Sequence, residues 1–236
     1  VGAAPSVRIN WTPKAEGATG LEVLANAELV HRVTLEEGVL RSQADVVYEI
    51  SRAELPSLQI EVPEDQRVIN VFDANVRQWA VAKSGAAAGF QRIVVSLFEP
   101  ARRTQRLTVE LEKYDAAPGE VRQVGVPLVR AVGVVRQQGI VVVQVAGELR
   151  AEAAERTGLL QLDASELPEA LRNRKWDFAY RYAALPFTLV LKAEKIKPRI
   201  LAESLTEVRL TPEELGLDLL VMYAVERAGV FRLDLD

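Results

Sequence analysis

The residues of this chain that could do chemistry are few and scattered. There is no cysteine and one histidine, His31, which excludes thiol nucleophiles and metal sites built from several histidines or cysteines. A lone histidine can carry a proton. However, no serine or acidic partner stands at a recognisable spacing from it, and it shares one side of an alternating segment with Leu29, Val33 and Leu35. We therefore expect a structural or surface histidine.

Acidic side chains are equally dispersed. A calcium loop needs closely spaced oxygen ligands, and the sequence contains no such run. Carboxylate pairs of the glycosidase type meet only in space and cannot be recognised from spacing. The nucleophile-elbow, phosphate-loop, dinucleotide-binding and zinc-protease motifs are absent as well. The sequence thus gives catalysis no support, and it predicts neither a metal site nor a cofactor.

One segment has the composition of a ligand-binding platform. Its aromatic residues alternate along the chain: Trp176, Phe178, Tyr180 and Tyr182. On a β-strand all four would project from one face, where an exposed row could stack on sugar rings or on a partner's apolar patch. The alternative is that this row is the core face of a strand packed against an opposing sheet. The small residues on the other side do not decide between the two.

The elements that must position these residues are β-strands. Period-two alternation dominates the chain, as in residues 107–111, where Leu107, Val109 and Leu111 share one face. Further strands are predicted at residues 46–50, 58–62, 93–98, 140–145 and 187–191, and the apolar segment 140–145 is expected to be a central strand. Turn residues separate the strands at intervals of roughly ten residues. This pattern predicts an all-β fold of antiparallel β-sandwich units, either two sandwiches or one large supersandwich.

Two further features complete the expected organisation. One short helix is predicted at residues 165–172, capped by Ser165. Residues 115–120 lack large apolar side chains and separate two strand-rich halves, so we predict one unit at 1–116 and a second at 117–236. Trp79, which lies between Val76 and Val81, is expected to be buried.

The end of the chain resembles its beginning. Tyr48-x-Ile50-x-Arg52-Ala53 matches Tyr223-x-Val225-x-Arg227-Ala228, and a Thr-x-Glu-Glu motif occurs at Thr34 and again at Thr211. The offset is about 175 to 177 residues. Alternating strands resemble one another by chance, but the matching order of the blocks favours tandem units. Residues 200–236 would then repeat 23–60 as part of a truncated array, and an uncovered edge strand there would favour self-association.

Composition limits the partners. Acidic and basic residues are interspersed and the net charge is −4, so no basic stripe is available for nucleic acid. No apolar run approaches the roughly 20 residues of a membrane-spanning helix.

Three stretches carry a family resemblance. They are Ile69-Asn-Val-Phe-Asp-Ala-Asn-Val-Arg-Gln-Trp79, Arg106-Leu-Thr-Val-Glu-Leu111 and the segment from Val126-Pro-Leu to Gly139-Ile-Val-Val-Val143. Together they resemble large, repeat-built bacterial proteins of the cell envelope. The resemblance implies β-sandwich modules in the periplasm or on the cell surface, with an envelope protein or glycan as partner, and it brings no catalytic residues. We therefore expect a non-catalytic structural or interaction module of a larger protein. The alternative is an accessory β domain that binds or helps to process carbohydrate.

Overall fold

The computed structural model describes residues 24–82, 85–114, 121–197 and 199–226. These residues form three β-sheets, and the only helical structure among them is one 3₁₀ turn and one α-helical turn. The prediction of an all-β fold is confirmed. The predicted helix at 165–172 is interrupted at Pro168, which separates the 3₁₀ turn Ala164–Glu166 from the α turn α1 (Glu169–Arg172). Among the described residues, no helix is long and apolar enough to cross a membrane.

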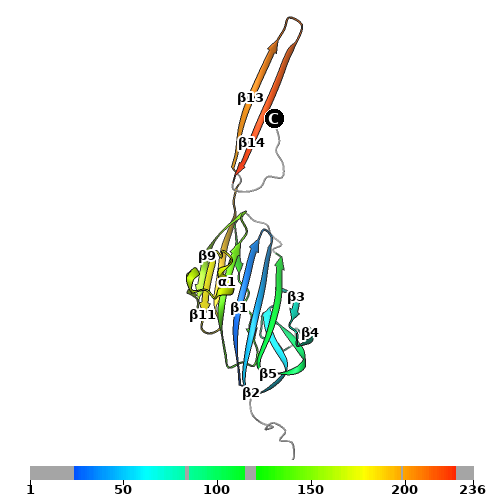
Figure 1. Ribbon diagram of the computed structural model, residues 1–236, viewed down its shortest axis with the longest axis vertical. Helices are drawn as coiled ribbons and strands as arrows, with labels where there is room; N and C mark the ends of the chain where they lie inside the picture. The colour runs from blue at the N-terminus through cyan, green and yellow to red at the C-terminus, as the bar shows by residue number, and fades with distance from the viewer. Residues whose placement is uncertain (1–23, 83–84, 115–120, 198, 227–236) are drawn as a thin grey trace, which may run out of the picture.

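The largest sheet has nine strands (Figure 1). Its main path runs β10-β11-β8-β1-β2-β5-β3, while β4 pairs with β5 and β7 pairs with β2. The strand bounds are β1 (Leu24–Glu36), β2 (Val39–Pro63), β3 (Arg67–Phe72), β4 (Val76–Ala82), β5 (Phe90–Tyr114), β7 (Arg130–Ala131), β8 (Arg136–Val145), β10 (Leu160–Gln161) and β11 (Phe178–Tyr182).

Two smaller sheets complete the described structure. One has the order β6-β12-β9, from β6 (Val121–Gly125), β12 (Thr188–Lys195) and β9 (Leu149–Thr157). The other is the hairpin of β13 (Arg199–Leu210) and β14 (Leu215–Glu226), which projects away from the rest of the molecule along its long axis (Figure 1).

The two longest strands are bent rather than broken. Residues 51–56 and 100–103, which lie between neighbouring predicted strands, fall inside β2 and β5, so each of these strands joins two predicted ones. At this point the pairing register between them shifts, and Ala53 and Arg103 adopt positive φ angles of 64° and 59°. A β-bulge adds an unpaired residue and bends a strand without ending it. The polar, proline-containing stretches therefore mark bulges, not turns.

Strand β8 is the central strand that its apolar sequence predicts. It lies between β1 and β11, and Val141, Val142 and Val143 are fully buried. Its two faces enter different clusters, because Val142 packs with Leu162, Leu167 and Leu171 under the helical turns. The pairing of β8 with β1 is parallel, which departs from the antiparallel prediction. A parallel pair needs a long crossover connection, and the chain between β1 and β8 supplies it.

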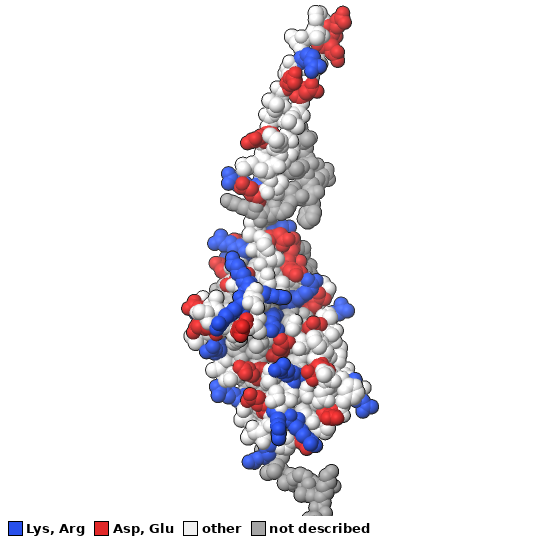
Figure 2. All heavy atoms as spheres, viewed as in Figure 1, with Lys and Arg blue, Asp and Glu red and all other residues white. Residues whose placement is uncertain are grey.

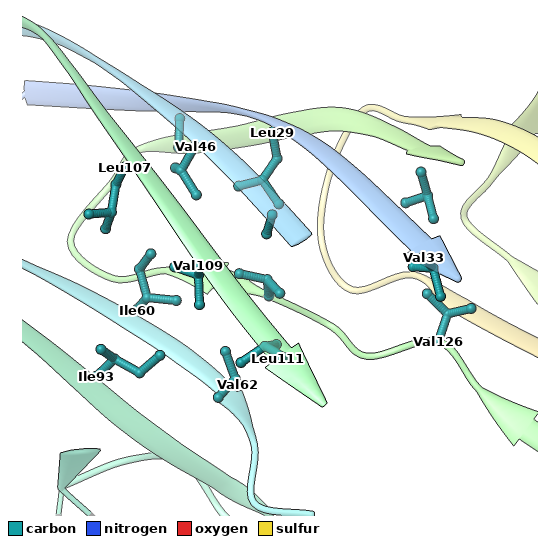
Figure 3. Packing of buried hydrophobic residues seen from close by; sticks show 14 of the residues in the cluster. Leu29, Val33, Val46, Ile60, Val62, Ile93, Leu107, Val109, Leu111 and Val126 are labelled. Atoms are coloured by element: carbon teal, nitrogen blue, oxygen red, sulfur yellow. The ribbon is translucent and has the colours of Figure 1, made fainter. Parts of the chain in front are cut away.

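The main core contains side chains of both the nine-stranded and the three-stranded sheets. Figure 3 shows part of this cluster, including side chains of β1, β2 and β5. Leu29, Val46, Ile60 and Leu107 of the large sheet belong to the same buried cluster as Leu189 of β12. Strands from both sides of residues 115–120 therefore share one core. Trp79 lies on β4, at the margin of the sheet, where it packs against this cluster and is partly buried, so the predicted burial is incomplete.

Candidate functional site

The aromatic row does not form an exposed platform. Tyr180 and Tyr182 are buried in the main core, and the Tyr182 ring lies 4.8 Å from the ring of Phe187. Phe178 is half-buried and stacks on Tyr180 at 6.5 Å. These three side chains therefore have the core role that the sequence left open.

Trp176 separates from the other three aromatic residues. It precedes β11 and packs with the smaller cluster around Leu171, and its indole Nε1–H donates a hydrogen bond to the Leu171 carbonyl at 2.8 Å. The four aromatic residues therefore alternate in the sequence, but only Phe178, Tyr180 and Tyr182 lie on the strand. The four residues offer no common surface for a sugar ring.

His31 is a core residue of β1. Its side chain is buried on the same face as Leu29 and Val33, and neither ring nitrogen has a hydrogen-bond partner among the described residues. Burial lowers the pKa of the imidazole from 6.5 to about 4. A neutral, enclosed imidazole whose ring nitrogens have no hydrogen-bond partner among the described residues has no geometry for proton transfer.

We call the described residues of 24–197, which form the nine-stranded and three-stranded sheets, the body. Its strongest polar feature is a buried ion cluster. Glu61 of β2 accepts a hydrogen bond from Arg92 of β5 at 2.7 Å and forms an ion pair with Arg130 of β7, and its side chain is 3% exposed. Burial raises the pKa of Glu61, but the hydrogen bonds from the two guanidinium groups outweigh this effect and hold the pKa below its usual range. The Arg130 guanidinium also lies 4.6 Å from the centre of the Phe90 ring.

This ion cluster borders a groove that Arg136, Gln137 and Leu185 also line. Because Glu61 already pairs with two of the groove's arginines, the cluster ties together β2, β5 and β7. Among the described residues, no group of three or more His, Asp or Glu side chains could hold a metal ion. Neither spacing nor alternation in the sequence indicates this cluster, because its members come from three separate strands.

The hairpin β13–β14 contains most of the exposed large apolar side chains among the described residues. Its strands pair antiparallel from Arg199↔Glu226 to Leu210↔Leu215. The turn is closed by Thr211, whose amide donates to the Glu214 carbonyl at 2.8 Å and whose hydroxyl accepts from the Glu214 amide at 3.0 Å. Within the described parts of the chain, neither strand pairs with any third strand.

The two faces of the hairpin differ in chemistry. Residues paired across the strands share a face, and successive residues alternate between faces. One side, which we call the apolar face, consists of Ile200, Ala202, Ser204, Thr206, Val208, Leu210, Leu215, Leu217, Leu219, Val221, Tyr223 and Val225. The other, the charged face, consists of Arg199, Leu201, Glu203, Leu205, Glu207, Arg209, Gly216, Asp218, Leu220, Met222, Ala224 and Glu226. Figure 2 shows acidic and basic groups of the hairpin among uncharged surface.

The apolar face is exposed to a degree that is unusual for a folded domain. Leu210, Leu215 and Leu217 are 78%, 68% and 64% exposed, respectively. Single exposed apolar residues are common, but a contiguous apolar patch on this scale marks an interaction surface or an aggregation hazard. The outer strand edges, which pair with no other strand in the described ranges, add main-chain groups that can bind another strand.

The hairpin has the same pairing register as β1–β2. Ala27 lies opposite Tyr48, and Ala202 lies opposite Tyr223. Leu35 and Leu40 close the first turn as Leu210 and Leu215 close the second. Adding 175 to both residue numbers of each β1–β2 pair, from Ala25↔Ile50 to Leu35↔Leu40, gives the corresponding pair of β13–β14. No residue is inserted or deleted between the two hairpins over this range. Thr34 lies on β1, whereas Thr211 lies in the turn, so the Thr-x-Glu-Glu motifs do not occupy equivalent positions.

Identity between the two hairpins concentrates on one face. On the apolar face, six of the twelve positions are identical, whereas on the opposite face only Glu28 and Glu203 match. The identical pairs are Ala27/Ala202, Val33/Val208, Leu35/Leu210, Leu40/Leu215, Val46/Val221 and Tyr48/Tyr223. In β1–β2 all twelve residues of this face are buried. The apolar face therefore has the side chains of a core surface but lies exposed.

No protein-family model and no curated protein matches the chain. Among solved structures, an M1 zinc metallopeptidase mutant from Deinococcus radiodurans has a TM-score of 0.36 at 14% identity, over 91% of this chain and 49% of that one. Leukotriene A4 hydrolase from Saccharomyces cerevisiae has a TM-score of 0.38 at 10% identity, over 83% of this chain and 31% of the enzyme. The chain thus spans less than half the length of these structures. Similarity at this level carries no conclusion about activity.

Proposed function

We propose that this chain is a non-catalytic interaction module of a repeat-built β protein, and that hairpin β13–β14 is the surface through which it assembles with a neighbouring β-sandwich unit. The observation that carries the proposal is the equivalence of the two hairpins. They share one register, and the face that is buried in β1–β2 is the face on which the identities concentrate.

The chemistry of the body favours this role over catalysis. His31 is enclosed without a partner, and Glu61 is held by two arginines of the fold. The aromatic row contributes to the core, so it offers no support for the carbohydrate-binding alternative. The resemblance of residues 69–79 and 106–111 to envelope proteins makes an extracytoplasmic setting part of the proposal.

A graft tests whether the hairpins are equivalent. In the full chain, residues 25–50 are replaced by the sequence of residues 200–225, which has the same length. The graft should fold, with one cooperative urea transition and the far-ultraviolet spectrum of the parent chain, because it places apolar residues at ten of the twelve positions that are buried in β1–β2. A control graft of residues 201–226 shifts the register by one residue and places the charged face inward, so it should not fold.

A shorter graft tests whether a failure of the longer graft is caused by poor packing of a few substituted core side chains. Replacing residues 33–48 by the sequence of 208–223 alters only two inward-facing positions, Ser42 and Ala44, both of which become leucine. If both grafts are as unstable as the register-shifted control, the two hairpins are not equivalent and the proposed function fails.

A further inference from the structure

We infer that the β14 edge of the hairpin accepts, in antiparallel orientation, an extended strand with the apolar alternation of β5, supplied by a neighbouring β unit. The inference rests on the proposed function and names the partner of the same surface. In the body, β2 lies between β1 and β5. If β13–β14 is equivalent to β1–β2, the strand missing from the described part of the hairpin is the counterpart of β5.

The register of this added strand follows from the body. There, Val46, Ala44 and Ser42 of β2 lie opposite Leu107, Val109 and Leu111 of β5. A displacement of 175 residues places Val221, Leu219 and Leu217 opposite the same three positions. These β14 residues belong to the apolar face, so the incoming stripe would extend that face and cover its edge.

Burial explains why a β5-type strand would bind. Leu107, Val109 and Leu111 are at most 2% exposed in the body, whereas Leu217 and Leu219 of the hairpin are 64% and 55% exposed. Strand addition removes apolar surface of both partners from water and pairs main-chain groups of the β14 edge, which has no partner strand other than β13 among the described residues. A strand without this alternation could still form main-chain hydrogen bonds with β14. It would not cover the apolar side chains of Leu217, Leu219 and Val221.

Electrostatics further restrict which residues the partner strand can carry. In the body, Glu110 of β5 lies opposite the neutral Gln43. The corresponding hairpin position is Asp218, 3.9 Å from Arg209. Like charges directly opposite each other disfavour pairing. The partner strand should therefore carry a basic or neutral residue where β5 has Glu110.

Disulfide trapping can read this register because the chain contains no cysteine. The probe is a peptide of residues 104–114 with Glu110→Lys and Val109→Cys, mixed with the full chain carrying Leu219→Cys in a buffer that contains oxidised glutathione as the oxidant. These two positions are predicted to be directly opposite each other, so the mixed disulfide should form rapidly. The same peptide should react slowly with a Leu215→Cys chain, four residues and roughly 13 Å further along the strand. A peptide with Lys113→Cys should reverse this preference.

Binding of cysteine-free peptides to the chain provides the matched controls. Leu219→Gln, on the apolar face, should weaken binding of the Glu110→Lys peptide at least about tenfold, whereas Met222→Gln, on the charged face and without a new charge opposite Arg106, should leave it within about twofold. The peptide that retains Glu110 should bind less tightly than the Glu110→Lys peptide. A peptide of the same composition with its alternation broken should not compete.

The inference would be overturned by no peptide binding, by equal trapping at both cysteine positions, or by equal binding of the peptide with broken alternation. Preferential trapping of two chains through Leu219→Cys would also overturn it, because the occupant would then be a second hairpin. The graft measures hairpin equivalence without any peptide. Folded grafts combined with failed trapping would therefore reject the strand partner alone, whereas unfolded grafts would reject the proposed function.

Discussion

Tyr48 and Tyr223 occupy the same position of two hairpins, each directly opposite an alanine of the preceding strand. Tyr48 is 1% exposed within the core, whereas Tyr223 is only half-buried. The two side chains thus share a local structure and differ in what covers them. Comparing the two tyrosines therefore separates the effect of the hairpin structure on stability from the effect of burial in the core.

Substituting the two tyrosines should therefore have unequal effects on stability. Tyr48→Ala opens a cavity in the core and should lower the free energy of unfolding by about 4 kcal/mol, measured by urea denaturation of the body. Tyr223→Ala should change it by less than about 1 kcal/mol. Equal losses would contradict the assignment of Tyr48 to the main core.

The hydroxyl of Tyr48 permits a second substitution. It has no hydrogen-bond partner among the described residues, and burial raises the pKa of this phenol. Tyr48→Phe removes an unpaired polar group without creating a cavity, so stability should stay within about 1 kcal/mol of the parent or increase. A loss above about 2 kcal/mol would indicate a hydrogen bond to the hydroxyl.

His31 should make stability depend on pH. Because its pKa falls from 6.5 in the unfolded chain to about 4 in the fold, the unfolded chain binds more protons between these values. Stability is retained above pH 6.5, falls as the pH is lowered toward 4, and loses about 3 kcal/mol through this group. His31→Leu should flatten the pH profile over this window and raise stability at pH 7 by about 1 kcal/mol, because two unpaired ring nitrogens leave the core. An unchanged profile would contradict the enclosed, neutral imidazole.

Glu61 should be the most sensitive ionic residue of the body. Glu61→Gln leaves Arg92 and Arg130 without their shared carboxylate and should cost about 3 kcal/mol in the free energy of unfolding. In the parent chain, the lowered pKa means that this contribution is present at neutral pH and is lost as the pH falls through the carboxyl range below about 4.5. The control is Glu152→Gln in the exposed pair with Lys192, which should cost less than about 1 kcal/mol. Equal effects would place Glu61 among ordinary surface pairs.

Gly139 should tolerate no side chain. A Cβ atom there would lie 2.2 Å from the Leu29 carbonyl oxygen and 2.9 Å from the Tyr182 hydroxyl, because β8 runs close to β1 at this point. Gly139→Ala should therefore lower stability by about 3 kcal/mol, with the loss measured by chemical denaturation. Gly125→Ala, on β6, meets nothing within 4 Å and should change stability by less than about 1 kcal/mol. A neutral Gly139→Ala substitution would contradict the parallel β1–β8 register.

Alternation in the sequence was sufficient to determine strand content and the faces of single strands. Residues 107–111 bury Leu107, Val109 and Leu111 as predicted, and the β-branched run at 140–145 lies in the central strand β8. These properties follow from the local geometry of a strand, in which side chains alternate between faces. The absence of cysteine and the single histidine likewise limited the available chemistry before any fold was known.

Tertiary structure alone decided which strands pair and what covers each face. It separated Trp176 from Tyr180 and Tyr182, placed β8 parallel to β1, and brought Glu61, Arg92 and Arg130 together from three strands. It also replaced an offset of 175 to 177 residues by a single register of 175, in which one hairpin is covered and the other exposed. The physical reason is that alternation is a property of neighbouring residues, whereas strand pairing and burial depend on contacts between segments far apart in the chain.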